Sequence, residues 1–294
     1  MYLPDPPQLL SPVSAEMCGP IRATGLSYKD HAAELNLPHP LHPVLFFKPP
    51  TTLASPSEPI PIPPICQDSQ MDYEVELALV LSRETRDVQP QDALDHVLGW
   101  TVANDLTARK WQGKCSQWGF CKGFDKFCPL GPCLVSPRLI PDPSVLQLTT
   151  HLNSTSMQSG SARKMIFPIP QIISFLSQGT TLPAGTVIIT GTPPGIGDGQ
   201  TPKVWLKDGD EVRCWISHGV GTLVNRIVYD GAIRKNRRSL ADRSRPDQRG
   251  QVGSGRVGSG RVESSGSEAA DSGWVKVMEM PAAAAVLGST IHTI

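Results

Sequence analysis

One stretch of the chain, residues 71–80 (MDYEVELALV), constrains the fold more than any other. Apolar side chains recur there at every second position, which is the period of a β-strand. The same period places Asp72, Glu74 and Glu76 on one face, with successive carboxylates about 7 Å apart. Carboxylates this close repel each other unless a cation or a basic partner lies between them. The strand is therefore either a ligand-bearing element for a hard cation such as Mg²⁺, Mn²⁺ or Ca²⁺, or a solvated acidic face.

Length and charge limit the classes of protein to consider. The chain has 294 residues, 39% of them hydrophobic, which allows one large or two modest domains with a packed core. Its formal net charge is zero and it holds no apolar run of about 18 residues, so we expect neither a nucleic-acid nor a membrane partner. The N-terminus lacks signal-peptide and transit-peptide features, so we expect a cytoplasmic protein, with the mitochondrion left open. The seven cysteines are expected to be reduced thiols, because no pair has C-x-x-C spacing.

Strand patterns dominate the chain, and helical patterns are few and short. Residues 1–20 are expected to be extended because proline recurs in them, and the Pro-rich residues 49–64 are expected to form a loop or an edge strand. Strands are predicted at residues 44–47, 73–82, 99–105, 146–152, 186–190, 211–216 and 222–228, the last two as a hairpin. Helices are predicted at residues 28–35, 93–98, 106–112 and 171–176, the first begun by a capping box of Ser27 and Asp30. These elements predict a mainly β, barrel-like α+β domain over residues 21–230.

The composition changes after Asp230. Residues 234–261 are rich in Arg, Ser, Gly and Asp, and they contain the near-repeat VGSGR-VGSGR. Such a segment cannot bury enough apolar surface to offset its ordering entropy, so residues 231–294 are predicted to form a low-complexity, disordered tail. Its arginines offer contacts to nucleic acid or to an acidic lipid surface as the alternative. The Ala-rich residues 278–287 are either a short helix or an unstructured end.

Two groups of residues have the chemistry of a catalytic centre. Asp105 closes the predicted strand 99–105, so it adds a third carboxylate to Glu74 and Glu76 if the two strands are neighbours. The alternative is that Asp105 caps the helix that follows it. His31 and Glu34 stand at i and i+3 on a predicted helix, where a carboxylate orients an imidazole as a general base. The alternative is an incidental surface pair.

Two further segments offer groups that bind anions. Lys122 lies in the segment CKGFD, among aromatic and apolar residues, where an ammonium group holds a carboxylate or stabilises an oxyanion. The alternative is an ordinary surface lysine. Residues 190–197 (TGTPPGIG) form a Gly/Pro turn after a buried strand, with hydroxyl and N–H groups suited to a carboxylate. This turn fits neither a P-loop nor a dinucleotide-binding loop.

Six segments together resemble the fumarylacetoacetate hydrolase superfamily, and within it the branch of small domain-containing proteins. They occur in the order and at the spacing of that family over residues 20–229, so the combination is specific although each segment alone is weak. The segments are GLSYKDHAAE (25–34), FKP (47–49), DYEVEL (72–77), ANDLTAR (103–109), KGFD (122–125) and TGTP (190–193).

The resemblance implies a fumarylacetoacetase C-terminal-like mixed β-sheet roll with few short helices, assembled as a homodimer. It implies Mg²⁺ or Mn²⁺, with Ca²⁺ as a further candidate, held by Glu74, Glu76 and Asp105. It also implies a role for each of six other residues: His31 and Glu34 as a catalytic dyad on a lid helix, Lys122 as the charge stabiliser, Thr192 on the substrate carboxylate, and Arg109 and Gln112 as pocket residues.

The implied activity is a metal-dependent hydrolase that cleaves a C–C bond in a short β-diketo or 2-keto acid of the acylpyruvate or fumarylpyruvate type, through an enolate held on the metal. The alternative is an oxaloacetate tautomerase, isomerase or decarboxylase that uses the same residues. A third reading, a catalytically weak protein that binds a partner through its Arg-rich tail, is disfavoured by the intact set of acids, His31 and Lys122.

Overall fold

The computed structural model describes residues 8–231. The predicted tail therefore lies outside the described residues except for Gly231, as do the near-repeat and residues 278–287. Within the described part of the chain, no helix has the length and apolar character needed to cross a membrane.

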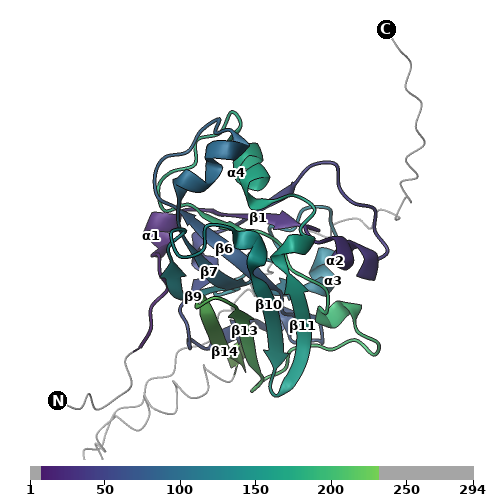
Figure 1. The fold of residues 1–294 in the computed structure, drawn as a ribbon. Coiled ribbons are helices and arrows are strands. Elements are labelled where there is room, and N and C mark those ends of the chain that lie inside the picture. Colours follow the sequence, from purple (N-terminus) through teal and green to yellow (C-terminus); the bar gives the residue numbers. More distant parts are fainter. Residues whose placement is uncertain (1–7, 232–294) are drawn as a thin grey trace, which may run out of the picture. The chain divides into compact units, whose positions relative to one another are not determined.

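Two larger β-sheets and one two-stranded ribbon make up the fold (Figure 1). The seven-stranded sheet has the order β2 (Val44–Lys48), β1 (Ile21–Gly25), β12 (Val187–Ile189), β6 (Val75–Leu81), β7 (Val97–Asn104), β9 (Cys128–Val135) and β3 (Leu53–Ala54). The five-stranded sheet has the order β11 (Thr155–Ser161), β10 (Gln147–Leu152), β13 (Glu211–Ile216), β14 (Gly221–Tyr229) and β4 (Ile60–Ile62). The ribbon pairs β5 (Met71–Asp72) with β8 (Thr107–Ala108).

Helices are short and lie between the strands. The α-helices are α1 (Ala15–Cys18), α2 (Lys29–Glu34), α3 (Arg109–Gln112) and α4 (Ile169–Ser177). The 3-10 helices are η1 (Pro50–Thr52), η2 (Pro64–Cys66), η3 (Pro90–His96), η4 (Pro143–Val145), η5 (Ala162–Lys164) and η6 (Gly197–Gly199). Each of the first four 3-10 helices has proline in its first turn, a position where the missing N–H costs no hydrogen bond.

Strand β6 is buried on both faces because the seven-stranded sheet has a hydrophobic core on each side. Val75, Leu77 and Leu79 belong to the larger core, which is shared with the five-stranded sheet. Ala78 and Val80 belong to a smaller core on the other face. Edge strands β2 and β3 are separated only by Pro49 and η1, so the sheet rolls over this smaller core. Glu76 shares the face of Ala78 and therefore points into the roll.

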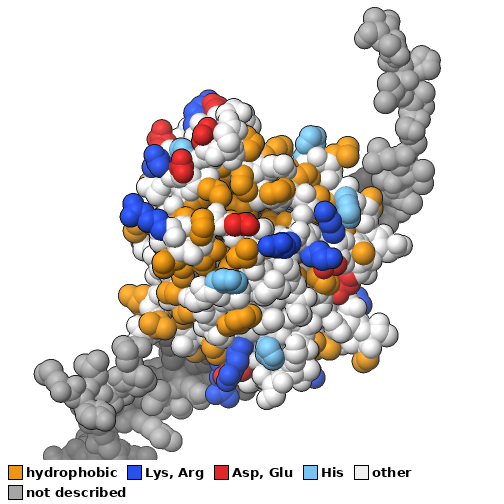
Figure 2. Space-filling view, in the orientation of Figure 1, with side chains coloured by type: hydrophobic (Ala, Val, Ile, Leu, Met, Phe, Trp, Pro, Cys, Tyr) orange, Lys and Arg blue, Asp and Glu red, His pale blue; other side chains and the backbone are white. Residues whose placement is uncertain are grey.

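The described elements confirm the expected fold class, a mainly β mixed sheet roll with few short helices. Strands β2, β6, β7, β10 and β12 and the 211–228 hairpin were predicted, whereas β1, β9 and β11 were not. Strand β4 is an edge strand of its sheet, as expected for residues 49–64. On the face shown in Figure 2, Lys and Arg side chains are scattered, and several of them lie beside Asp or Glu. The division of the chain at residues 20/21 and 230/231 stays a prediction.

Several local predictions were wrong. Residues 8–20 are not extended throughout, because Ser14 caps α1 through its side chain. The capping box does not form: the Ser27 hydroxyl donates to Thr24, and Tyr28 precedes α2 without a side-chain cap. The predicted helix 93–98 is the 3-10 helix η3 followed by the start of β7, and the predicted helix 106–112 shrinks to α3, because residues 107–108 pair with β5.

Candidate active site

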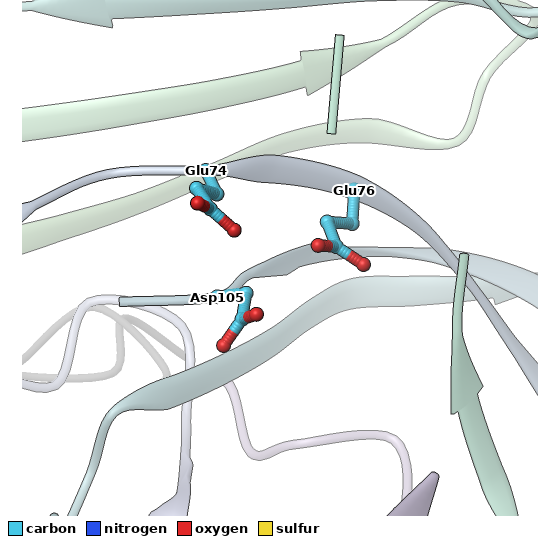
Figure 3. Close-up of side chains that lie close together, drawn as sticks. All are labelled: Glu74, Glu76 and Asp105. Carbon is cyan, nitrogen blue, oxygen red and sulfur yellow. The ribbon is translucent and has the colours of Figure 1, made fainter. Parts of the chain in front are cut away.

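Three buried carboxyl groups meet inside the roll (Figure 3). Glu74 directly precedes β6 and Glu76 lies near its start, and Asp105 directly follows β7, the antiparallel neighbour of β6. The register pairs Glu76 with Ala103, so the end of β7 delivers Asp105 beside the two glutamates. One carboxylate oxygen from each residue lies within 4.8 Å of the others. Asp105 does not cap the following helix, whose N-cap is Ala108.

Two buried lysines neutralise part of this charge. Lys122 Nζ donates to Glu74 Oε2 at 2.9 Å and to Asp105 Oδ2 at 2.5 Å. Lys48 Nζ donates to the other oxygen of Asp105 at 2.5 Å and to the Phe127 carbonyl at 2.8 Å. Burial alone would lower the pKa of Lys122, but Asp105 and Glu74 outweigh it and raise that pKa, so the ammonium stays charged.

Arg109, at the start of α3, ties a fourth acid to the site. Its Nε donates to Asp72 at 2.8 Å, its Nη2 donates to Glu74 at 2.6 Å, and its Nη1 donates to Gln112 at 2.9 Å. Asp72 also accepts the backbone N–H groups of Gly197 and Asp198. Asp72 thus belongs to the same acidic stretch of sequence as the two glutamates but not to the triad. It instead binds Arg109 and the loop that contains η6.

Glu76 is the acid whose charge is least compensated. It accepts one hydrogen bond, from Gly191 N at 2.6 Å, and it forms no ion pair with any described residue. Burial, followed by Asp105 and Glu74, raises its pKa well above the usual range. Burial also raises the pKa of Glu74, but Lys122 and Arg109 outweigh it and bring that pKa to about 2.

The residues present fit a hard divalent cation. The donor set consists of three carboxylates without cysteine or imidazole among them, which suits Mg²⁺, Mn²⁺ or Ca²⁺ better than zinc. A cation at this point would remove the repulsion that Glu76 otherwise experiences from its two neighbours.

The predicted dyad forms on α2. His31 Nδ1 and Glu34 Oε2 are 2.8 Å apart, and both side chains are largely buried. The other oxygen of Glu34 accepts the Gly195 N–H at 2.8 Å, which anchors α2 to the loop after β12. A Cβ atom at Gly199 would lie 2.8 Å from Oε1 of Glu34, so a larger residue there would have to displace this carboxylate.

One cavity of about 400 Å³ joins the triad to the dyad. Eight of the nine predicted site residues line it: His31, Glu74, Glu76, Asp105, Arg109, Gln112, Lys122 and Thr192. Glu34, the ninth, stands behind His31. The Thr192 hydroxyl donates to the Val75 carbonyl and accepts from Gln158, so it must change partners to bind a substrate carboxylate. The separate roles of the nine residues stay predictions.

The sequence did not point to four residues that shape this site. In the sequence, Lys48 stands out only as part of the FKP segment, and Gln158, Phe46 and Trp118 belong to no functional pattern. Gln158 is a buried side chain that joins Val75, between the two glutamates, to Thr192. A polar residue in a polar strand carries no signal of burial, so only the arrangement of the sheets identifies it.

Comparison with known proteins agrees with this geometry. The family described as Fumarylacetoacetate (FAA) hydrolase C-terminal matches residues 20–228. Oxaloacetate tautomerase FAHD2A, mitochondrial, of Homo sapiens is 41% identical over 206 residues, covering 69% of this chain and 65% of that protein. Caffeoylpyruvate hydrolase of Neonothopanus nambi is 43% identical over 223 residues, covering 75% of this chain and 71% of that protein. The matched part therefore spans slightly less than two thirds of the human relative.

Solved structures show the same fold. Fumarylacetoacetate hydrolase from psychrophilic Exiguobacterium antarcticum has a TM-score of 0.70 at 37% identity, covering 77% of this chain and 80% of that one. The 5-carboxymethyl-2-hydroxymuconate delta-isomerase from Mycobacterium smegmatis has a TM-score of 0.65 at 36% identity, covering 76% and 82%. A protein described as a hydrolase and one described as an isomerase thus share this architecture. The chain belongs to the fumarylacetoacetate hydrolase family.

Proposed function

We propose that this protein is a metal-dependent hydrolase that cleaves a C–C bond in a short β-diketo or 2-keto acid of the acylpyruvate type. The observation that carries this proposal is one cavity lined by a buried carboxylate triad, a buried ammonium group and the imidazole of His31, which Glu34 holds from behind. An acyl cleavage needs a charge stabiliser and a base for water, and these groups supply both.

Glu74, Glu76 and Asp105 would hold Mg²⁺ or Mn²⁺, with Ca²⁺ as a further candidate. When bound, such an ion supplies a positive charge that polarises a carbonyl group and orients the oxygens of a 2-keto acid. Arg109 and Gln112 fix the shape of the wall beside it through their mutual hydrogen bond.

The dyad acts on water. Because His31 uses Nδ1 to bond Glu34, its Nε2 is the nitrogen that accepts a proton from water. The water oxygen then bonds to the distal carbonyl carbon, and the bond between that carbon and the adjacent CH₂ carbon breaks. The electron pair passes to the keto-acid fragment as an enolate, which takes up a proton to give pyruvate beside a carboxylic acid. Lys122 stabilises the negative charge that develops.

A tautomerase, isomerase or decarboxylase acting on oxaloacetate is the second candidate. The His31–Glu34 pair supports this candidate, because a base alone can move a proton between the enol and keto forms. Such a transfer needs no positioned water. The name of the human relative also points to this chemistry. The two candidates differ in whether water adds to a carbon atom.

An ultraviolet assay of the purified protein with Mn²⁺ separates the candidates. We expect acetylpyruvate to lose its enol absorbance with acetate and pyruvate formed. Accelerated keto–enol exchange of oxaloacetate without cleavage of acetylpyruvate would support the tautomerase instead, and pyruvate from oxaloacetate alone would support a decarboxylase. His31→Gln should lower kcat roughly 10²–10⁴-fold, whereas His39→Gln, an exposed control outside the cavity, should leave it unchanged.

The remaining expectations concern the oligomeric state and the location of the protein. A homodimer and a cytoplasmic location stay predictions, with the mitochondrion open because the human relative carries that word in its name. Size-exclusion chromatography with light scattering tests the dimer, and cell fractionation tests the compartment.

A further inference from the structure

The inner face of β2 changes from basic to apolar toward the opening of the cavity. Lys48, Phe46 and Val44 share this face because they stand two residues apart. Lys48 is fully buried against Asp105, and the Phe46 ring centroid lies 5.1 Å from Lys122 Nζ. Val44, about 7 Å further along the strand, lines the cavity and is 37% exposed. An apolar wall therefore begins beside the reactive groups and continues to solvent.

Trp118 forms a second apolar wall at right angles to the first. Its ring packs edge-on against Phe46, with centroids 5.4 Å apart and planes at 72°. A Cβ atom at Gly25 would lie 2.2 Å from the Trp118 ring, so the indole rests directly on the backbone of β1. Gly25 pairs with Val44 across the two strands, which places the indole beside the same stretch of β2.

The segment after α2 adds a third wall. Leu35 and Leu37 both line the cavity, and Leu37 is 48% exposed. Apolar side chains from three separate segments thus line the cavity, while the charged groups stay with the carboxylate triad.

The basic residues of the cavity are already engaged. Lys122 is bonded to Glu74 and Asp105, and Arg109 is bonded to Asp72 and Glu74. Among the described residues that line the cavity, no lysine or arginine is left to pair with a second carboxylate. Burying an unpaired carboxylate against Phe46 and Trp118 would be unfavourable, so these walls favour an uncharged distal group.

We infer that the site takes a 2-keto acid whose distal acyl group is large, apolar and flat, such as an aryl group, and that Trp118 and Val44 select it. This inference rests on the proposed function for the position of the keto-acid end. The cavity of about 400 Å³ lies in the size range of pockets that enclose ring-containing ligands. The dicarboxylic acids fumarylpyruvate and oxaloacetate fit this half of the cavity poorly.

Binding of two 2-keto acids that cannot be cleaved tests the inference independently of turnover. The probes are 2-oxo-4-phenylbutanoate and 2-oxobutanoate, titrated calorimetrically into the full chain with Mn²⁺. We expect the aryl acid to bind at least about tenfold more tightly, because its ring leaves water for the apolar walls. Benzoylpyruvate should likewise exceed acetylpyruvate in kcat/KM.

Two variants and a matched control test whether Trp118 and Val44 cause the preference for the aryl acid. Trp118→Ala should bring the two affinities close to equality while binding of 2-oxobutanoate is retained. Val44→Ser should weaken binding of the aryl acid alone, and it keeps the claim testable if Trp118→Ala does not fold. Leu45→Ser is the control, because Leu45 is similarly exposed on the same strand but points away from the cavity.

The outcomes separate the inference from the proposed function. Equal binding of both acids by the unaltered protein overturns the aryl site and leaves the proposed function in place. An aryl preference that survives both variants shows that these residues do not select the ligand, which also overturns the inference. Failure of both acids to bind in the presence of Mn²⁺ overturns the proposed function and the inference together.

Discussion

At the scale of single residues, the site contains more acidic than basic side chains. Four buried carboxyl groups belong to Asp72, Glu74, Glu76 and Asp105. Three cations, Lys48, Lys122 and Arg109, are bonded to them. Glu76 is the acid that these cations leave without an ion pair, so an added divalent ion is most strongly favoured next to it.

Removing the charge of Glu76 should therefore weaken metal binding without unfolding the protein. Glu76→Gln keeps an oxygen that accepts the Gly191 N–H. In the unaltered protein, Mn²⁺ at 100 times its dissociation constant should add about 2.7 kcal/mol of stability, which is roughly a 5–11 °C rise in Tm. We expect this rise to vanish in Glu76→Gln and to persist in Glu84→Gln, an exposed control. An undiminished rise in Glu76→Gln would remove it from the ligand set.

Lys48 should matter for stability although it does not line the cavity. Lys48→Met leaves Asp105 with one partner fewer and the Phe127 carbonyl without this donor. Breaking a buried pair in this way costs about 3–5 kcal/mol, measured as the free energy of unfolding in urea. Lys126→Met removes a partly exposed pair with Glu58 and should cost less than about 1 kcal/mol. Equal losses in the two variants would contradict the buried role.

The residues whose chemistry is unusual in their context could be predicted from the sequence. A row of acids on one strand and a His–Glu pair at helical spacing are visible in one dimension. Lys48 could not be found in this way, because a lysine at the end of an apolar strand is normally solvated. Its burial follows from the rolling of the sheet, which brings β2 close to Asp105.

At the scale of secondary-structure elements, a single side chain braces the two sheets. Gln158 on β11 accepts from Val75 N and Thr150 Oγ1 through its oxygen. Its nitrogen donates to Thr192 Oγ1 and to the Pro193 carbonyl. All of these groups are buried, and together they fix Val75 at the start of β6, between Glu74 and Glu76.

Gln158→Met should loosen this brace while preserving the volume of the side chain. Several buried polar groups would lose a partner, and we expect the free energy of unfolding to fall by about 2–5 kcal/mol. Metal affinity should fall with it, since β6 positions two ligands. Gln147→Met on the neighbouring strand removes an exposed bond to Ser161 and serves as the control. An unchanged urea midpoint in Gln158→Met would show that the brace is dispensable.

Elements with a clear period were predicted, and elements without one were missed. Strand β9 contains Pro129, Gly131 and Pro132, which disfavour a strand in isolation, and tertiary pairing overrides this preference. Strand β11 (TSMQSGS) is almost entirely polar because it is an edge strand of the five-stranded sheet. Helix α3 is shorter than predicted because β8 recruits the two residues before it.

At the scale of the whole molecule, burial divides the seven thiols into two classes. All seven cysteines lie in the described part of the chain and are free, which agrees with the expected reduced thiols. Cys115 and Cys133 are exposed, and the other five are buried. Burial raises the pKa of Cys66, Cys128 and Cys214 to about 12.

Thiol titration of the native protein should therefore find two fast groups. A raised pKa leaves less thiolate at pH 8, and only the thiolate attacks a disulfide reagent. We expect Ellman's reagent to modify two cysteines rapidly and the other five only after denaturation. Replacing both Cys115 and Cys133 by Ser should abolish the fast phase. A third rapidly reacting thiol would show that one of the buried cysteines becomes accessible in solution.

The double burial of β6 has a consequence for how the length of this chain can vary. Losing one residue inside β6 would exchange the two faces of the strand, carrying Glu76 toward the hydrophobic core and Val75 toward the carboxylate triad. Neither position tolerates that exchange. The exposed turn at Asn153 and Ser154 faces no such restriction, because added residues there extend into solvent without changing the pairing of the two strands that it joins. Insertions and deletions should therefore be accepted at that turn and rejected within β6.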